Sequence, residues 1–209
     1  CTGIVAGYLG TNALECLIEN VYVSGTVSGI QQVGGIGGIF AKGTVRNCYA
    51  DVKVIGSSRA GGIVAEPRNA VVVENCFATG TLYSTGNAGG IAGGLNGNNP
   101  TIKGCIAWNE QIDGEPVSGR VIGWQSNTYT KATDCYAKKD MIIAWGPNKG
   151  MTGADANTAG TYDWGNNKTA ICHGITTENS VDAAKKIGWS TDIWDLSGVT
   201  PLLKSFNDK

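Results

Sequence analysis

Two short phrases recur along this chain at nearly constant spacing, and this repetition limits the folds open to it. The first is a small residue followed by Gly-Gly-Ile, repeated after 27, 28 and 30 residues at Val33–Ile36, Ala60–Ile63, Ala88–Ile91 and, in a degenerate copy, Ser118–Val121. The second is Asn-Cys-aromatic-Ala at Asn47–Ala50 and Asn75–Ala78, and it recurs with Gly or Asp in place of Asn at Gly104–Ala107, where Ile106 replaces the aromatic residue, and at Asp134–Ala137, with spacings of 28, 29 and 30 residues. A looser copy near Gly3 and Asn20 brings the number of units to about five.

A unit of this length cannot bury an apolar face alone, whereas stacked units can. Each unit holds short β-branched runs separated by glycine, with no helical periodicity. The chain is therefore predicted to be all-β: a parallel β-solenoid of about five coils over residues 1–145, each coil about 4.8 Å above the last. The 32 glycines fit many tight turns, because five prolines and no three-residue period exclude collagen, and an apolar content of 42% excludes disorder.

Stacking places equivalent positions of successive coils above one another. Two positions of the second phrase differ by two residues and carry small apolar side chains, so both are predicted to point inward; they are Val21, Cys48, Cys76, Cys105 and Cys135, and Val23, Ala50, Ala78, Ala107 and Ala137. The position between them is predicted to point outward: Tyr22, Tyr49, Phe77, Ile106 and Tyr136. The position before them suits a left-handed turn, since Asn, Gly and Asp tolerate that conformation: Asn20, Asn47, Asn75, Gly104 and Asp134.

The phrase Asn75-Cys76-Phe77-Ala78-Thr79-Gly80-Thr81-Leu82, after Gly-Gly-Ile, resembles the GLUG repeat, and the resemblance covers residues 1–145. The ending Ile187-Gly188-Trp189, Ile193-Trp194-Asp195 and Pro201–Lys204 also resembles the segment that closes such arrays. GLUG repeats belong to surface and secreted bacterial proteins, often from Bacteroidetes and Firmicutes, and also flank immunoglobulin A-cleaving metallopeptidases. The resemblance implies an extracellular or cell-surface location and no catalytic residue.

From Gly146 the repeat is lost, and residues 146–209 are predicted to form a C-terminal cap on the open end of the solenoid. Gly146–Lys168 is expected to be a loop. A short capped helix is predicted between Asn179 and Ile187. Asn179 is its N-cap with Asp182 three residues later, and Gly188 ends it. A last strand is expected near Val199–Leu203.

Repeat-like sequence begins at Gly3, which leaves two interpretations of the N-terminus. Either the chain is a fragment of a longer protein, or Cys1 is the acylated first residue of a lipoprotein and carries a lipid anchor. The four cysteines of the inward column are expected to be buried thiols, since their parallel Cβ vectors make poor disulfide geometry. Cys1, Cys16 and Cys172 lie outside the column and could pair, with no basis for choosing a pair.

The residue pattern predicts a protein that is not an enzyme and holds no metal or cofactor. The lone His173 accompanies no nucleophile motif, and no Cys/His spacing suits zinc. The acidic residues fall at different phases of the repeat, unlike the clustered carboxylates of polysaccharide-cleaving β-helices, so a solvated surface is expected for them: Asp51, Glu66, Glu74, Glu110, Asp113 and Glu115. A net charge of −1 gives no electrostatic case for nucleic acid, and no apolar run is long enough to span a membrane.

The outward aromatic column is the candidate ligand site. If its rings are exposed, the column would form a flat stripe that binds sugar rings or a protein partner, made of Tyr22, Tyr49, Phe77 and Tyr136. The alternatives are that the rings fill a corner of the core or are covered by the tail. Trp108, Trp124 and Trp145 are expected to seal the interior near the cap. The leading hypothesis is a noncatalytic extracellular adhesion or binding module whose partner is a glycan or a surface protein. The alternatives are an accessory domain of a secreted peptidase or glycan-active enzyme, and a polysaccharide-acting enzyme.

Overall fold

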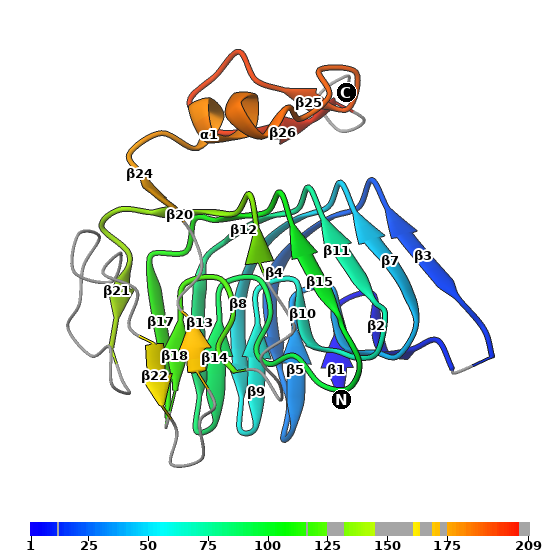
Figure 1. Ribbon diagram of the computed structural model, residues 1–209. Helices are drawn as coiled ribbons and strands as arrows, with labels where there is room; N and C mark the ends of the chain where they lie inside the picture. The colour runs from blue at the N-terminus through cyan, green and yellow to red at the C-terminus, as the bar shows by residue number, and fades with distance from the viewer. Residues whose placement is uncertain are drawn as a thin grey trace.

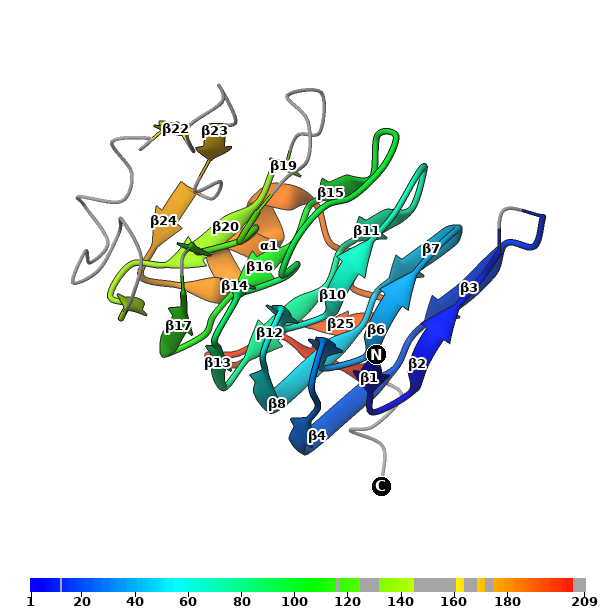
Figure 2. The same cartoon turned by 90° about the horizontal axis from the view of Figure 1, so that it is seen from below.

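The computed structural model describes residues 1–11, 13–115, 117–124, 132–144, 161–163, 169–171 and 175–204, and it is a parallel β-solenoid of about five coils (Figure 1). The predicted fold class is confirmed. A coil passes from one sheet to the next as it turns, and strands of successive coils pair in parallel within each sheet. Figure 2 shows this stacking, with β3, β7, β11, β15 and β19 side by side in coil order.

Four parallel sheets form the walls of the solenoid. The first holds β1 (Thr2–Gly3), β5 (Gln32–Gly34), β9 (Arg59–Gly61), β14 (Asn87–Gly89) and β18 (Ser118–Gly119), and the second holds β2 (Ala6–Leu9), β6 (Gly37–Phe40) and β10 (Val64–Pro67). The third holds β3 (Cys16–Glu19), β7 (Gly43–Arg46), β11 (Val72–Glu74), β15 (Thr101–Lys103) and β19 (Ala132–Thr133). The fourth holds β4 (Tyr22–Ser28), β8 (Tyr49–Gly56), β12 (Phe77–Thr79), β13 (Thr81–Ser84), β16 (Ile106–Ala107), β17 (Gln111–Gly114), β20 (Tyr136–Lys138), β21 (Ile142–Ile143) and β24 (Ile175–Thr177).

The strand register places the repeated positions in columns, as predicted. Tyr49 pairs with Phe77, and Ala50 pairs with Ala78, in adjacent coils. The inward assignment of the cysteine and alanine columns is confirmed, since their members from the second coil onward are buried in one apolar core. In the first coil, Val23 is buried, whereas Val21 is half-buried at the edge of that core.

The turn before each cysteine is left-handed in every coil, which also confirms the prediction. The φ angles lie between 51° and 58° at Asn20, Asn47, Asn75, Gly104 and Asp134. The glycines of the Gly-Gly phrase are needed for close packing and not for a left-handed turn. A Cβ atom on Gly62 would collide with the Gly90 carbonyl of the next coil and with the Ala78 side chain, so this corner of the coil needs glycine for close packing.

The C-terminal segment folds back over the outer side of the fourth sheet (Figure 1). Helix α1 (Ser180–Ile187) begins after Asn179, whose side chain accepts hydrogen bonds from the backbone N–H groups of Val181 and Asp182, and it ends at a left-handed Gly188. The predicted helix and both its caps are confirmed. The last strand, β26 (Leu202–Leu203), pairs antiparallel with β25 (Trp194–Asp195), within the range expected for it.

The segment between the coils and the helix was expected to be a loop, but part of it is a strand. Within Gly146–Lys168 the described residues form a strand, β22 (Thr161–Asp163), which pairs antiparallel with β23 (Thr169–Ile171). The rest of that range, with Trp145, Cys172 and His173, lies outside the described residues. Strand β24 pairs in parallel with β20 and so extends the fourth sheet beyond position 145. The division at 145/146 stays a prediction.

The described thiols are all reduced. Cys1 is exposed, Cys16 is half-buried, and both are free, so these two do not pair with each other. The column thiols are free and buried, as expected. In the described part of the chain, no helix is both long and apolar enough to cross a membrane.

Candidate functional site

The predicted aromatic stripe is largely covered by the C-terminal segment. Tyr22, Tyr49 and Phe77 form a ladder with ring centroids 5.0 Å apart, and Trp189 meets Phe77 edge-on at 6.5 Å. Phe77 and Ile106 are fully buried beneath α1 and the tail tryptophans. Tyr49 and Tyr136 are half-buried, and Tyr22 is 38% exposed. The tail therefore covers the middle of this column. A ligand role for the aromatic stripe stays a prediction for its exposed end.

Glu66 is the exception to the expected solvated acidic surface, since the other five acidic residues are half-buried or exposed. Its side chain is 0% exposed, although it lies on the outer side of β10. Its carboxylate accepts hydrogen bonds from Gln32 Nε2 at 3.1 Å and from Asn96 Nδ2 at 2.9 Å. It also forms ion pairs with Arg59 and, at 2.5 Å, with Arg68 Nε. Four donors on other strands and loops thus replace the water that a surface carboxylate would have.

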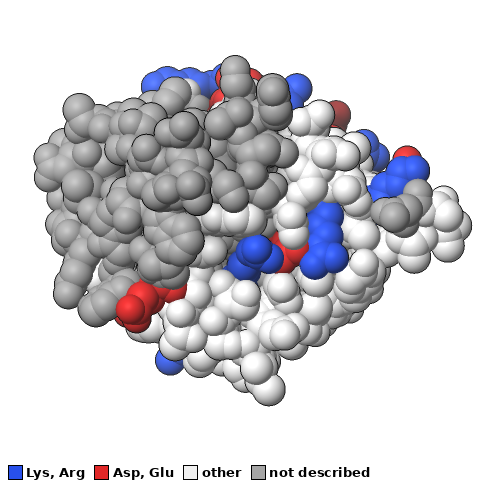
Figure 3. Space-filling model, turned by 60° about the horizontal axis from the view of Figure 1, so that its bottom comes forward, with Lys and Arg blue, Asp and Glu red and all other residues white. Residues whose placement is uncertain are grey.

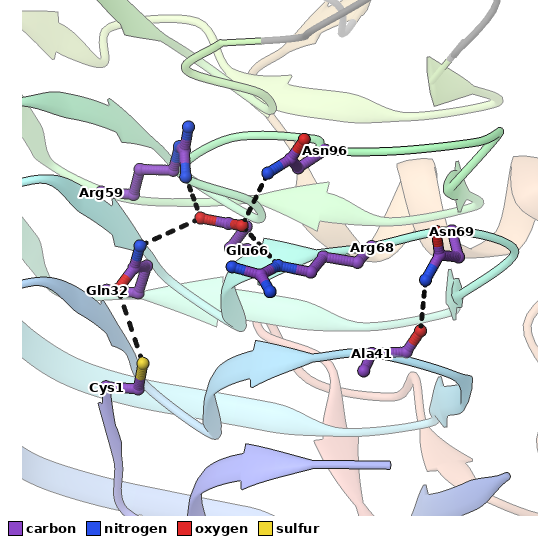
Figure 4. A network of polar contacts seen from close by, with 8 residues as sticks. All are labelled: Cys1, Gln32, Ala41, Arg59, Glu66, Arg68, Asn69 and Asn96. Carbon is purple, nitrogen blue, oxygen red and sulfur yellow. Dashed lines mark hydrogen bonds and ion pairs between the residues drawn. The ribbon is translucent and has the colours of Figure 1, made fainter. Parts of the chain in front are cut away.

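These five residues lie where the first two sheets meet at an angle, and we call them the polar corner: Gln32, Arg59, Glu66, Arg68 and Asn96 (Figure 4). Gln32 and Arg59 are register partners in β5 and β9 of the first sheet. Glu66 comes from β10 of the second sheet, and Arg68 pairs with Asn96 in the following bridge. Figure 3 shows basic groups on either side of acidic atoms near the middle of the described surface on this side.

The polar corner has more positive than negative charge. Two guanidinium groups face one carboxylate, so the ion pairs leave an excess of one positive charge. Burial lowers the pKa of Arg59 from its ordinary value, and the neighbouring charge of Arg68 lowers it further. The Arg59 guanidinium also lies 4.7 Å from the ring centroid of Trp124, a cation–π contact that favours its charged form.

Trp108 and Trp124, which were expected to seal the interior, lie outside it. Trp124 stacks on Arg59 outside the coils, and Trp108 packs against the apolar cluster beneath the tail. Neither belongs to the interior core. The interior is filled instead by the small columns and by aliphatic side chains, with Phe40 as an aromatic member.

A pocket of about 410 Å³ opens beside the polar corner. It is lined by Tyr8, Ala41, Arg68, Asn69, Asn96 and Gly97, and we call it the corner pocket. Tyr8 is 54% exposed, and Arg68 contributes a side chain that is 33% exposed. A pocket of this size, with an aromatic ring, amides and a guanidinium, has the composition of a site for a small polar ligand.

Sequence reasoning missed the polar corner, although one signal was present. Polar residues stand immediately before the Gly-Gly phrase in three successive coils, at Gln32, Arg59 and Asn87. This polar column faces outward beside the strand that carries Glu66. Among the described residues, no group of three His, Cys, Asp or Glu side chains is arranged to hold a metal ion.

Comparison with known proteins comes from structure alone. No family model and no curated protein sequence matches the chain. A crystal structure from Bacteroides ovatus, described as a "putative immunoglobulin A1 protease", matches with a TM-score of 0.73 and 25% sequence identity. The match covers 97% of this chain and 63% of that one, so this chain spans less than two thirds of the length of the protein it resembles. The chain thus shares the solenoid fold of that protein, together with the C-terminal segment, over nearly its whole length.

Proposed function

We propose that the chain is a noncatalytic, extracellular binding module that recognises glycans through the corner pocket. The observation that carries the proposal is the polar corner itself. Its carboxylate is saturated by four donors, so it has no free lone pair directed at a substrate. The adjoining pocket offers an aromatic face, amides and a guanidinium, which bind sugars but do not cleave them.

The resemblance to GLUG repeats supports an extracellular location, because these repeats belong to surface and secreted bacterial proteins. The Bacteroides ovatus match supports the same location and favours a second candidate function. In that alternative the chain is an accessory domain of a secreted peptidase, and its binding brings a catalytic domain to a glycoprotein. Both functions assign binding rather than chemistry to this chain.

The test is a glycan array probed with the purified chain, followed by product analysis. Retention of a glycan without shortening or release of sugars supports a binding module. Cleavage of a retained glycan would make the chain a polysaccharide-acting enzyme. Incubation with immunoglobulin A1 separates the second candidate: retention without cleavage favours an accessory domain, and cleavage by this chain alone contradicts both noncatalytic functions.

A further inference from the structure

Arg68 contacts Glu66 through its Nε only, which leaves the two terminal amino groups of its guanidinium without a role in holding Glu66. Arg68 donates its Nε to Glu66 Oε1 at 2.5 Å, and its backbone N–H donates to the Phe40 carbonyl at 2.8 Å. Its terminal amino groups contact no partner in the described part of the chain. A guanidinium bound through Nε still presents two terminal amino groups, and two such groups match the two oxygens of a carboxylate.

Glu66 holds Arg68 in place instead of neutralising it. The charge of Glu66 is already balanced by Arg59, whose orientation is fixed by Trp124. Gln32 and Asn96 hold the carboxylate from two further sides, as Figure 4 shows. The Arg68 side chain is therefore held at the border of the corner pocket, and no second acid among the described residues compensates its positive charge.

The rest of the corner pocket suits a sugar ring. The register places Tyr8 beside Ile39 and Ile39 beside Glu66, so Tyr8 lies two coils, or roughly 10 Å, from the carboxylate along the solenoid axis. An exposed tyrosine ring packs against the apolar face of a sugar, whereas amides bind its hydroxyl groups. Ala41 and Gly97 are small and leave room between the ring and the guanidinium.

We propose that the corner pocket is selective for saccharides that carry a carboxylate, and that Arg68 binds this carboxylate while Tyr8 packs on the sugar ring. This inference rests on the proposed glycan-binding function and adds its ligand class. A lone carboxylate of an acidic peptide would satisfy Arg68 but would leave the Tyr8 face without its partner. The pairing of the two residues therefore favours an acidic sugar.

The test is isothermal titration calorimetry with three probes of equal length: an oligogalacturonide, a neutral galactose oligomer and a sulfated galactose oligomer. Wild-type protein is expected to bind the oligogalacturonide about tenfold or more tightly than the neutral oligomer, with weaker binding at higher salt. The sulfated oligomer separates carboxylate geometry from anionic charge. If it binds as tightly as the oligogalacturonide, the carboxylate selectivity is wrong.

Arg68→Gln is expected to remove the preference for the acid, so that the acidic and the neutral oligomer bind with similar affinity. Arg46→Gln is the matched control, because Arg46 also pairs with a glutamate, Glu19, but lies on β7 of another sheet. Tyr8→Ala is expected to weaken binding of both oligomers. If Arg68→Gln does not fold, Arg68→Lys is the second variant. It keeps the positive charge but cannot bind a carboxylate in a bidentate manner, so it is expected to lose most of the preference for the acidic oligomer.

Each outcome decides a separate point. Equal affinity for acidic and neutral oligomers overturns the inference and leaves the proposed function intact. No affinity for any saccharide overturns the proposed function as well. A poly-glutamate peptide is a further probe: if it binds as tightly as the oligogalacturonide, the pocket recognises negative charge alone and the assignment to sugars is wrong. An equal loss of affinity in Arg46→Gln and Arg68→Gln would show that the effect is not specific to the corner pocket and would overturn the assignment to Arg68.

Discussion

Cys76 illustrates how a single residue is fitted to the interior of this solenoid. Its side chain is fully buried, and its Sγ lies 3.2 Å from the Glu74 carbonyl and 3.8 Å from the Val45 carbonyl. Burial raises the pKa of this thiol well above its ordinary value, so it stays neutral at physiological pH. A neutral thiol serves here as a small apolar group that also donates weakly to backbone oxygens.

Replacement of Cys76 by Asp is therefore expected to lower the free energy of unfolding by about 3 kcal/mol or more. The carboxylate would lie unpaired among backbone carbonyl oxygens that repel it. Cys76→Ala is expected to cost about 1 kcal/mol, and Cys76→Ser, which keeps a donor toward Glu74, less than Asp does. Urea denaturation of the four proteins measures the differences. An Asp variant as stable as wild type would mean that the column contacts water.

Glu66 shows where reasoning from single residues fails. The cysteine and alanine columns could be predicted because each coil repeats the same residue type at the same place. Glu66 occurs once, and its surroundings depend on four residues from two other positions of the repeat. The polar residues before the Gly-Gly phrase repeat, but Glu66 itself does not, so its burial and the corner pocket could not be predicted from the repeat.

At the scale of the elements, the turns decide how one strand passes into the next. Asn75 has φ of 51° and connects β11 to β12, and the equivalent turn of the next coil uses Gly104 at 58°. Side chains without a short polar group adopt this conformation at a cost. These turns and the helix caps were predictable because they depend on neighbours in sequence, whereas α1 docks on Phe77 and Ile106, which are distant in sequence.

Asn75→Val is expected to destabilise the protein by about 1–3 kcal/mol, because a β-branched residue resists a left-handed backbone. Asn75→Gly is expected to be nearly neutral. Asn87→Val is a suitable control, since Asn87 is a half-buried asparagine in β14 whose φ is not positive. Thermal melts of the three variants test the turn. Equal losses in Asn75→Val and Asn75→Gly would show that the asparagine amide, and not the backbone conformation, stabilises this turn.

At the scale of the whole molecule, the coils and the C-terminal segment have separate apolar clusters. The coils share one interior core, whereas the segment packs on the outside through Trp189, Trp194 and α1 against Phe77 and Ile106. Trp189 is the central contact. It is 4% exposed, stacks on Trp194 at 4.4 Å, and donates its indole N–H to the Gly104 carbonyl at 2.9 Å.

Trp189→Ala is expected to release the C-terminal segment while the coils stay folded. Loss of a buried tryptophan removes about 3–5 kcal/mol, which is enough to undock a short helix and a two-strand pair. The coils keep their own hydrogen-bonded ladders, from β8 to β12 and beyond, and do not depend on this contact. Phe77 and Ile106 would then become exposed, and an apolar dye should bind to them.

Hydrogen exchange read by mass spectrometry measures this separation directly. In the variant, amides of α1 should exchange much faster than in wild type, and amides of β8 and β12 should keep their protection. Trp124→Ala is the matched control, because Trp124 stacks on Arg59 at the polar corner, away from the tail, and its loss should leave exchange in α1 unchanged. If α1 and the coils lose protection together in Trp189→Ala, the segment and the solenoid form one cooperative unit, and the outer cluster is part of what folds the coils.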